Sequence, residues 1–322
     1  MLNDATKDTH NFLLLLFAHF HKLDSLDFYI AGESFGGSWV PHLANRISQS
    51  QKSPIADLAQ NTYSPPLPEI QLKGIMLGNV ALSNIYQWKG FFPTGCLGEH
   101  PLLNASVCEI MATAQPRCDS LLVSCKASDY EPMICEAALQ FCRKHSVFAI
   151  FDTGRNPYDI RQKCEGGYEG TCYAIIDTAG AYLNNPWVKK ELGVKSSFEF
   201  SQCNSEIFTD FEAAGDISRS TDRIVGQLLN LGLEVLVYVG DQDWYCNAAG
   251  MSSVVNEISW EGQTEFRLQK EVAWYVGGTE AGSKKMFKGL SYVTVFDAGH
   301  MVPLDKAKES LTMVNDWING ML

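Results

Sequence analysis

Four short stretches of the chain are continuously apolar instead of alternating between apolar and polar positions. Each is rich in β-branched or aromatic residues and is bounded by Gly or Asp, which is typical of a β-strand. Continuous apolarity predicts strands that are covered on both faces, as in a parallel sheet. The predicted strands are residues 27–32, 74–79, 234–240 and 291–297.

Helical patterns separate or flank these strands, so the sequence predicts an α/β protein. Helices are expected over residues 41–50, 221–231 and 306–321. In the last of these, apolar residues recur at helical spacing and predict one buried face. They are Ala307, Leu311, Val314 and Ile318.

The pattern changes between residues 84 and 219, where cysteines, turn signals and short helical pieces replace the strands. Such a segment between two strand-bearing parts is typical of an insertion. We therefore expect three parts: a first core part over residues 1–83, a cap insertion over 84–219 and a second core part over 220–322.

Ten cysteines are spread unevenly, with eight of them between Cys96 and Cys172 and only Cys203 and Cys246 outside that range. Their spacings do not repeat C-x-x-C and no histidine cluster accompanies them, so a zinc site is not expected. A disulfide-rich insertion fits the spacing better, and it indicates an oxidising compartment.

The formal net charge of −12 and the pI of about 5.0 describe an acidic chain without a basic patch. This composition argues against nucleic acid or an anionic membrane as a partner. The apolar run over residues 12–18 is too short to span a bilayer, and we expect it to belong to an amphipathic helix that continues to Phe20.

No signal peptide is recognisable, because Asp4 and Asp8 follow Met1 where a basic start is expected. The cysteine content nevertheless indicates the secretory pathway. We therefore expect that the true start of the protein is missing from this sequence.

The first predicted strand leads directly into Gly32-Glu33-Ser34-Phe35-Gly36, a G-x-S-x-G pattern that precedes a predicted helix. At a sharp strand-to-helix turn the serine hydroxyl is exposed, and flanking glycines let strand and helix pass closely. A serine hydroxyl is a weak nucleophile, so it needs a base and a donor for the oxyanion. The backbone N–H of Phe35 is the candidate donor.

An acid and a histidine follow the third and fourth predicted strands. Asp243 comes after the third strand and His300 after the fourth, so the order is Ser, Asp, His, as in the α/β-hydrolase fold. The carboxyl ends of parallel strands lie at one edge of a sheet, where these loops converge. Asp241 competes as the acid, but Asp243 lies further along the loop and has more reach.

Glu33, next to the serine, is open to two interpretations. A protonated carboxyl group at this place donates a hydrogen bond to a substrate carboxylate, provided that burial or a second carboxyl group raises its pKa. The alternative is a solvated side chain at the turn, without a role in binding.

Six segments together resemble the serine carboxypeptidase family, and the likeness extends over essentially the whole chain. They are I-A-G-E-S-F-G-G at 30–37, T-G-R-N-P-Y-D-I-R at 153–161, C-E-G-G at 164–167, Y-V-G-D-Q-D-W-Y-C-N at 238–247, G-H-M-V-P at 299–303 and S-L-T-M-V-N-D-W-I at 310–318. The resemblance implies an α/β-hydrolase fold, with a mostly parallel sheet, helices on both faces and a disulfide-rich helical cap.

The resemblance also implies an acid-active exopeptidase that removes C-terminal residues one at a time, without a cofactor, in a vacuole, a lysosome-like compartment or outside the cell. Peptide and protein C-termini are the implied partners. The implied catalytic residues are Ser34, Asp243 and His300. The implied substrate-binding residues are Glu33 for the terminal carboxylate and Cys246 and Met301 at the pocket walls.

The family pattern pairs the cysteines of the insertion and leaves Cys246 as a free thiol, against the alternative that it is half of a disulfide. Each short closed loop stabilises the insertion by about 2–3 kcal/mol in the chain-entropy model. The implied pairs are Cys96–Cys108, Cys118–Cys142, Cys125–Cys135 and Cys164–Cys172. Asn104 begins the sequon Asn104-Ala105-Ser106 and is the predicted glycosylation site.

The chain departs from the family at its front, where the upstream strands and a W-x-N-G-G-P-G stretch do not occur. In the family this stretch supplies the second oxyanion donor, and the same region holds the partner carboxyl of Glu33 and a cysteine for Cys203. We therefore expect a truncated form with weak or no activity. An acyltransferase or esterase on the same scaffold, and a non-catalytic binding module, are the alternative functions.

Overall fold

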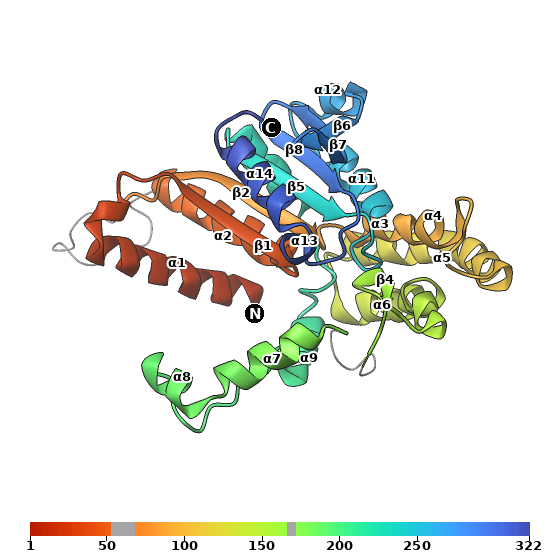
Figure 1. Cartoon of the computed structure of the whole chain (residues 1–322), viewed down its shortest axis with the longest axis horizontal. Coiled ribbons are helices and arrows are strands. Elements are labelled where there is room, and N and C mark those ends of the chain that lie inside the picture. Colours follow the sequence, from red (N-terminus) through yellow and green to blue (C-terminus); the bar gives the residue numbers. More distant parts are fainter. Residues whose placement is uncertain (53–67, 166–171) are drawn as a thin grey trace.

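The computed structural model describes residues 1–52, 68–165 and 172–322. Gly166 and Gly167 of the C-E-G-G segment therefore lie outside the described residues. The described part contains a six-stranded sheet with the order β1-β2-β5-β8-β7-β6 (Figure 1). These strands are β1 (Phe28–Ser34), β2 (Leu72–Val80), β5 (Glu234–Gly240), β6 (Val272–Val276), β7 (Thr279–Phe287) and β8 (Leu290–Val295).

The four strands predicted from apolar runs are β1, β2, β5 and β8, and they lie side by side and parallel. Strands β7 and β6 add an antiparallel hairpin that the apolar pattern did not predict. The reason is their composition, since β7 carries Lys284 and Lys285 and β6 alternates between exposed and buried positions. Such an edge hairpin does not need the continuous apolarity of a central strand.

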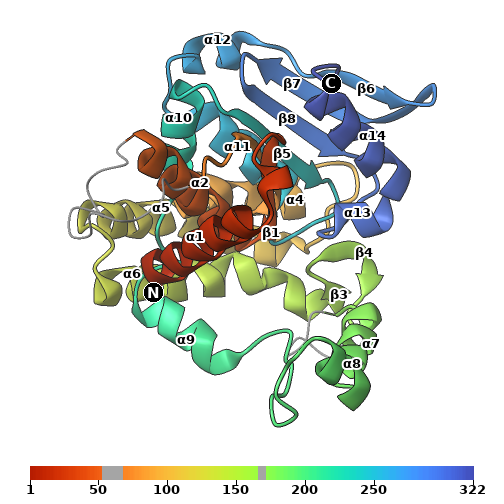
Figure 2. The same cartoon turned by 90° about the vertical axis from the view of Figure 1, so that its left-hand side faces the viewer.

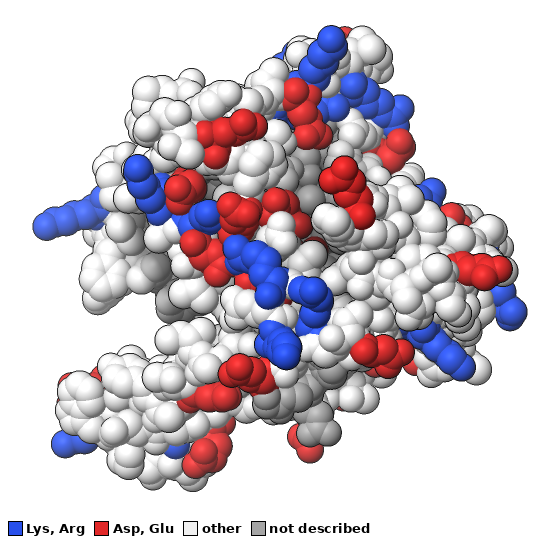
Figure 3. All heavy atoms as spheres, turned by 45° about the vertical axis from the view of Figure 1, so that its right-hand side comes forward, with Lys and Arg blue, Asp and Glu red and all other residues white. Residues whose placement is uncertain are grey.

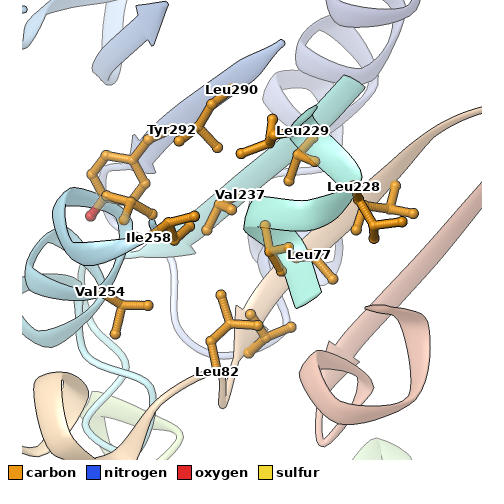
Figure 4. Packing of buried hydrophobic residues seen from close by; sticks show 14 of the residues in the cluster. Leu77, Leu82, Leu228, Leu229, Val237, Val254, Ile258, Leu290 and Tyr292 are labelled. Atoms are coloured by element: carbon orange, nitrogen blue, oxygen red, sulfur yellow. The ribbon is translucent and has the colours of Figure 1, made fainter. Parts of the chain in front are cut away.

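One face of the sheet is covered by α2 (Gly36–Lys52), α10 (Asp222–Asn230) and α11 (Ala248–Glu257). Figure 4 shows the core on this side, where Leu228 and Val254 from the helices pack with Leu77 and Val237 from the strands. Helix α12 (Gln263–Leu268) extends this layer through the fully buried Phe266.

The opposite face is covered by α13 (Val302–Asp305) and α14 (Ala307–Ile318). The prediction of a closing helix is right, but its predicted buried face is wrong. The residues of α14 that face the core are Ser310, Met313 and Trp317, whereas Leu311 is 65% exposed and Ile318 42% exposed. Apolar residues occur on two neighbouring stripes of this helix, and the stripe with the bulky Trp317 and Met313 buries the larger surface.

Helix α1 (Leu2–His19) lies beside α2 at the β1 end of the sheet (Figure 2). Leu13 and Phe17 of α1 pack with Leu43 and Ile47 of α2. This contact buries one side of the apolar run near the amino terminus, whereas Phe12 and Leu15 of the same run are exposed. Of the described helices, none has the length and apolarity needed to cross a membrane.

The segment predicted as the cap insertion is mainly helical. Its helices up to residue 145 lie beyond the ends of the strands toward which the β5 arrow points, whereas its helices over residues 174–191 lie below α1 in the same view (Figure 1). Helices α5 and α6 form an antiparallel pair that two disulfides cross-link. The elements are α3 (Asn84–Gln87), α4 (Phe91–Cys96), α5 (Ala105–Ala127), α6 (Pro132–His145), β3 (Arg155–Asn156), β4 (Asp159–Lys163), α7 (Ala174–Leu183), α8 (Pro186–Glu191) and α9 (Ser205–Ala213), with the 3-10 turns His21–Leu23, Trp88–Gly90 and Val147–Thr153.

Candidate active site

Ser34 ends β1, and the loops that follow β5 and β8 carry Asp243 and His300. Ser34 is the last residue of β1 and has a φ of 58°, a left-handed backbone conformation that is strained for a non-glycine residue. Gly32 permits this sharp turn, because a Cβ there would lie 2.6 Å from the side chain of Val40 in α2. The backbone of the turn therefore holds the serine where strand and helix cross.

Asp243 and His300 are in direct contact, with 2.6 Å between Asp243 Oδ2 and His300 Nδ1. Asp243 is fully buried and His300 is 5% exposed. Burial lowers the pKa of His300, but the charge of Asp243 and its hydrogen bond outweigh burial and raise the pKa above the ordinary value. The pair therefore favours a protonated imidazole more strongly than a solvated histidine does.

Asp241, the alternative acid, contacts the backbone of the loop after β8. Its Oδ1 accepts a hydrogen bond of 3.4 Å from the backbone N–H of Ala298, across the same loops. Burial is the main cause that raises the pKa of Asp241. The geometry thus brings Asp243, and not Asp241, to the imidazole of His300.

Asn79 is a site residue that the sequence reasoning missed. It lies near the carboxyl end of β2, is fully buried, and has a φ of 43°. Its Nδ2 donates to Asp243 Oδ2 at 2.8 Å, and its Oδ1 accepts from the N–H of Gly240 at 3.1 Å. Asp243 Oδ2 thus accepts two hydrogen bonds, whereas Asp243 Oδ1 has no partner among the described residues.

The available signal for Asn79 was its position, directly after the apolar run of the second predicted strand. Polar residues at the carboxyl ends of parallel strands are candidates for the site. Its partner was not readable, because Asp243 lies 164 residues further along the chain.

Glu33 lies on β1 with an exposed side chain, and in the described part of the chain no hydrogen bond reaches its carboxyl group. Protein atoms around this group desolvate it and raise its pKa; the charge of His300 opposes this rise and that of Asp243 adds to it. The environment therefore shifts Glu33 toward the protonated form that can donate a hydrogen bond.

A hollow of about 450 Å³ opens beside Ser34. Phe35 and Cys246 line it, together with the aromatic side chains of Trp88, Phe148 and Tyr245. The backbone N–H of Phe35 donates no hydrogen bond within the described structure, so it is available to a ligand. Met301 lies next to His300 in the chain but does not line this hollow as described.

A second hollow of about 420 Å³ adjoins the first and shares Ser34 and Phe35 with it. Its walls are predominantly apolar and come from α2 and α9, and they include Trp39, Phe208 and Phe211. Cys203 also lines it. Two adjoining hollows with apolar walls are therefore available beside the serine.

Cys246 forms no disulfide and is buried. Burial raises the pKa of its thiol well above the ordinary value, and the charge of Asp243 adds to this effect. Cys246, Asp243 and His300 are also the one group of side chains, in the part of the chain described, whose ligand atoms lie within 4.8 Å of one another. A metal would have to break the Asp243–His300 bond and bind a thiol that resists ionisation, so this set fits a metal poorly.

In the described residues, no hydrogen bond joins Ser34 to His300. Such contacts are often long before a substrate binds, so the arrangement is compatible with acyl transfer.

The structure forms four disulfides, and they have the pairing that the resemblance implies: Cys96–Cys108, Cys118–Cys142, Cys125–Cys135 and Cys164–Cys172. Cys203 and Cys246 stay outside them.

Asn104 is exposed and lies at the N-cap of α5, where its Oδ1 accepts from the N–H of Val107 at 3.0 Å. The glycan-accepting atom is the other side-chain atom, Nδ2. Glycosylation at Asn104 stays a prediction.

The parallel strands, the helices on both faces and the serine at the strand-to-helix turn define a protein of the α/β-hydrolase class. The family model described as serine carboxypeptidase matches residues 2–320. The chain therefore belongs to the serine carboxypeptidase family.

Several relatives are similar over nearly the whole chain. Carboxypeptidase Y of Candida albicans is 35% identical over 318 residues, which are 98% of this chain and 55% of the relative. The vacuolar serine-type carboxypeptidase ATG42 of Saccharomyces cerevisiae is 34% identical over 98% of this chain and 60% of its own length. The chain thus spans little more than half the length of these relatives.

A solved structure supports the fold. Kex1Δp, a prohormone-processing carboxypeptidase from Saccharomyces cerevisiae, superposes with a TM-score of 0.78 at 22% identity, over 99% of this chain and 67% of that chain. At this identity the likeness establishes the α/β-hydrolase fold and no more than the fold.

Proposed function

We propose that the chain carries the catalytic centre of a serine-type carboxypeptidase, which releases C-terminal amino acids from peptides at acidic pH. The observation that carries the proposal is the buried 2.6 Å contact between Asp243 and His300, at the sheet edge where Ser34 ends β1. An acid that orients a histidine beside an exposed serine is the arrangement of nucleophilic acyl transfer.

In the proposed mechanism Ser34 Oγ attacks the carbonyl carbon of the last peptide bond and transfers its proton to His300 Nε2. Asp243 holds the Nδ1–H tautomer and stabilises the imidazolium. The N–H of Phe35 donates to the oxyanion. His300 then protonates the leaving amine, and a water molecule, activated by the same imidazole, releases the acyl group from Ser34.

We further propose that Glu33 binds the terminal carboxylate of the substrate and that Cys246 forms a wall of a side-chain pocket. The same role stays a prediction for Met301, which lines neither hollow beside Ser34. The raised pKa of Glu33 supports its part, because a protonated carboxyl group donates to a carboxylate and an ionised one repels it. Binding is therefore strongest below this pKa and is lost as the pH rises through it. Glu33→Gln keeps a donor at every pH, so its KM should vary less with pH than that of the wild type.

A blocked dipeptide, assayed at about pH 5 with detection of the free C-terminal amino acid, tests the reaction. Ser34→Ala should lower turnover by at least about 10³-fold, since the nucleophile is gone. Ser48→Ala is the matched control, because Ser48 is a buried serine of α2. Turnover that survives Ser34→Ala, or cleavage of esters without release of amino acids, would contradict the proposal.

Peptide and protein C-termini are the proposed partners, and a vacuolar or secretory location is the proposed compartment. The four disulfides and the vacuolar relative support this location. On the face shown in Figure 3, Lys and Arg side chains are interspersed with Asp and Glu, which supports a partner other than nucleic acid. We also propose that residues 84–219 form a cap.

A further inference from the structure

The β3–β4 hairpin, which lies in the cap segment, has no part in the mechanism above, yet it contacts both catalytic loops. Figures 1 and 2 place β4 next to α13, at the carboxyl edge of the sheet. The hairpin belongs to the T-G-R-N-P-Y-D-I-R segment, to which acyl transfer assigns no chemistry. Its contacts indicate what it does.

The first set of contacts holds the loop that carries Asp243. The N–H of Ile160 donates to the carbonyl of Gln242 at 2.9 Å, and the N–H of Trp244 donates to the carbonyl of Pro157 at 3.0 Å. These two bonds bracket Asp243 in the chain. The hairpin therefore fixes the backbone immediately before and after the acid.

The second set holds the loop that carries His300. The N–H of His300 donates to the carbonyl of Tyr158 at 2.7 Å. The Tyr158 ring lies edge-on to the imidazole, with ring centroids 5.0 Å apart and an angle of 64° between the planes. One hairpin residue thus contacts both the backbone and the ring of His300.

Arg161 adds an ionic link to the same loop. Its guanidinium donates to both carboxylate oxygens of Asp159, at 2.8 and 2.7 Å, to Asp305 Oδ2 at 2.9 Å and to the carbonyl of Asp297. Asp305 Oδ2 in turn accepts from the N–H of Gly299 at 2.7 Å. Residues on both sides of His300 are therefore bound to one arginine, either directly or through Asp305.

The hairpin and the loop that carries His300 can approach this closely only because residue 299 is a glycine. A Cβ on Gly299 would lie 2.6 Å from the carbonyl oxygen of Tyr158 and 2.8 Å from Cβ of Asp159. Asp159 is fully buried, and a buried carboxylate is stable only when it is paired, which Arg161 provides. Loss of the arginine therefore leaves a buried charge directly against the His300 loop.

We propose that Arg161 is a positioning residue for His300, which acts by clamping the loop between β8 and α13 to the β3–β4 hairpin. Its effect on turnover rests on the proposed function, whereas its effect on the place of His300 does not. Misplacement of a catalytic group by about 1 Å lowers turnover by about 100-fold. Arg161→Met should therefore lower kcat by about 10- to 100-fold and leave KM within about twofold.

Arg267→Met is the matched control, because Arg267 also pairs with a carboxylate, Glu257 at 2.7 Å, and with a backbone carbonyl, Asn256 at 2.7 Å. The two arginines are similarly exposed, 36% for the Arg161 side chain and 45% for Arg267. Arg267 lies on α12, away from the catalytic loops. Arg161→Met should unfold at a lower denaturant concentration than Arg267→Met, because it leaves the buried Asp159 unpaired, and only Arg161→Met should change kcat.

The second readout needs no turnover. The ring signals of the seven histidines are recorded by proton–carbon NMR, and His300→Gln identifies the signal of His300. In Arg161→Met this signal should move or broaden, since the ring shifts against Tyr158, while it should stay in place in Arg267→Met. If Arg161→Met does not fold, Asp305→Asn replaces it, because the amide keeps an acceptor for Gly299 and loses the charge that faces Arg161.

The outcomes separate the two proposals. An unchanged His300 signal in Arg161→Met, or equal changes in both arginine variants, would overturn the positioning role. A wild type that releases no amino acid would contradict the proposed function, while the NMR signal would still decide where Arg161 holds His300. If the His300 signal moves in Arg161→Met but kcat is unchanged, Arg161 has only a structural role. This outcome would also overturn the proposed positioning role.

Discussion

Asn79→Asp is a nearly isosteric change at the one side chain that, among the described residues, donates to Asp243 alongside His300. It converts a hydrogen-bond donor into a second carboxyl group, 2.8 Å from a carboxylate oxygen, at a fully buried position. Asp tolerates the positive φ of this position nearly as well as Asn, so the backbone is not the source of any effect.

The size of the effect follows from the pKa of the new carboxyl group. Two carboxyl groups that share a site hold one proton between them, and in a buried site one pKa rises by about 3 units. Each unit corresponds to about 1.4 kcal/mol, so the ionised variant loses about 4 kcal/mol of stability. A protein of this kind has about 5–15 kcal/mol in total, so the loss is large.

Because the pKa of the new carboxyl group is raised, the loss of stability depends on pH in a characteristic way. The folded-state pKa of the new group lies above its unfolded value of about 3.9, so the folded state binds more protons and stability falls as the pH rises between the two values. Below about pH 4 the protonated group donates to Asp243 as the amide does, and the penalty is small. The positive charge of His300 offsets part of the penalty until the pH exceeds the raised pKa of His300.

Denaturant unfolding, followed by tryptophan fluorescence between about pH 4 and 8, measures this penalty against the wild type. Asn204→Asp is the control, since the exposed Asn204 side chain caps α9 by accepting from the N–H of Ile207, where a carboxylate is well tolerated. The midpoint of Asn79→Asp should fall progressively behind the wild type as the pH rises. A penalty that is the same at every pH, or equal in both variants, would refute the reasoning.

Three further changes test other parts of the structure. Replacing Cys118 and Cys142 by Ser should lower stability by about 3 kcal/mol in thermal unfolding, because the disulfide closes a segment of 24 residues. Gly299→Ala should cost about 1–3 kcal/mol in denaturant unfolding, because its Cβ meets a hairpin carbonyl; an unchanged midpoint would contradict the clamp geometry. Iodoacetamide at about pH 7 should alkylate the exposed Cys203 well before Cys246, which is buried with a raised pKa, and mass spectrometry of timed samples would expose equal rates if this is wrong.

The fold was readable from the sequence where strands are continuously apolar. Of the four parallel strands, β2, β5 and β8 are central and largely buried, whereas β1 lies at the edge of the sheet and is only partly buried, and the strand-to-helix turn at Ser34 has its own glycine. The β6–β7 hairpin was not readable, because an edge hairpin with Lys284 and Lys285 lacks that pattern. The buried face of α14 was misassigned for a related reason, since two of its stripes are apolar and only packing decides between them.

The sequence by itself determined the α/β class, the order Ser34, Asp243, His300 along the chain, and the family to which the chain belongs. Only the tertiary structure decided that Asp243 meets His300, that Asn79 supports this acid from β2, and that Arg161 ties the hairpin to the histidine loop. The physical reason is distance along the chain. Local patterns predict burial and turns, whereas hydrogen bonds between residues more than fifty positions apart form only once the sheet has brought the loops together.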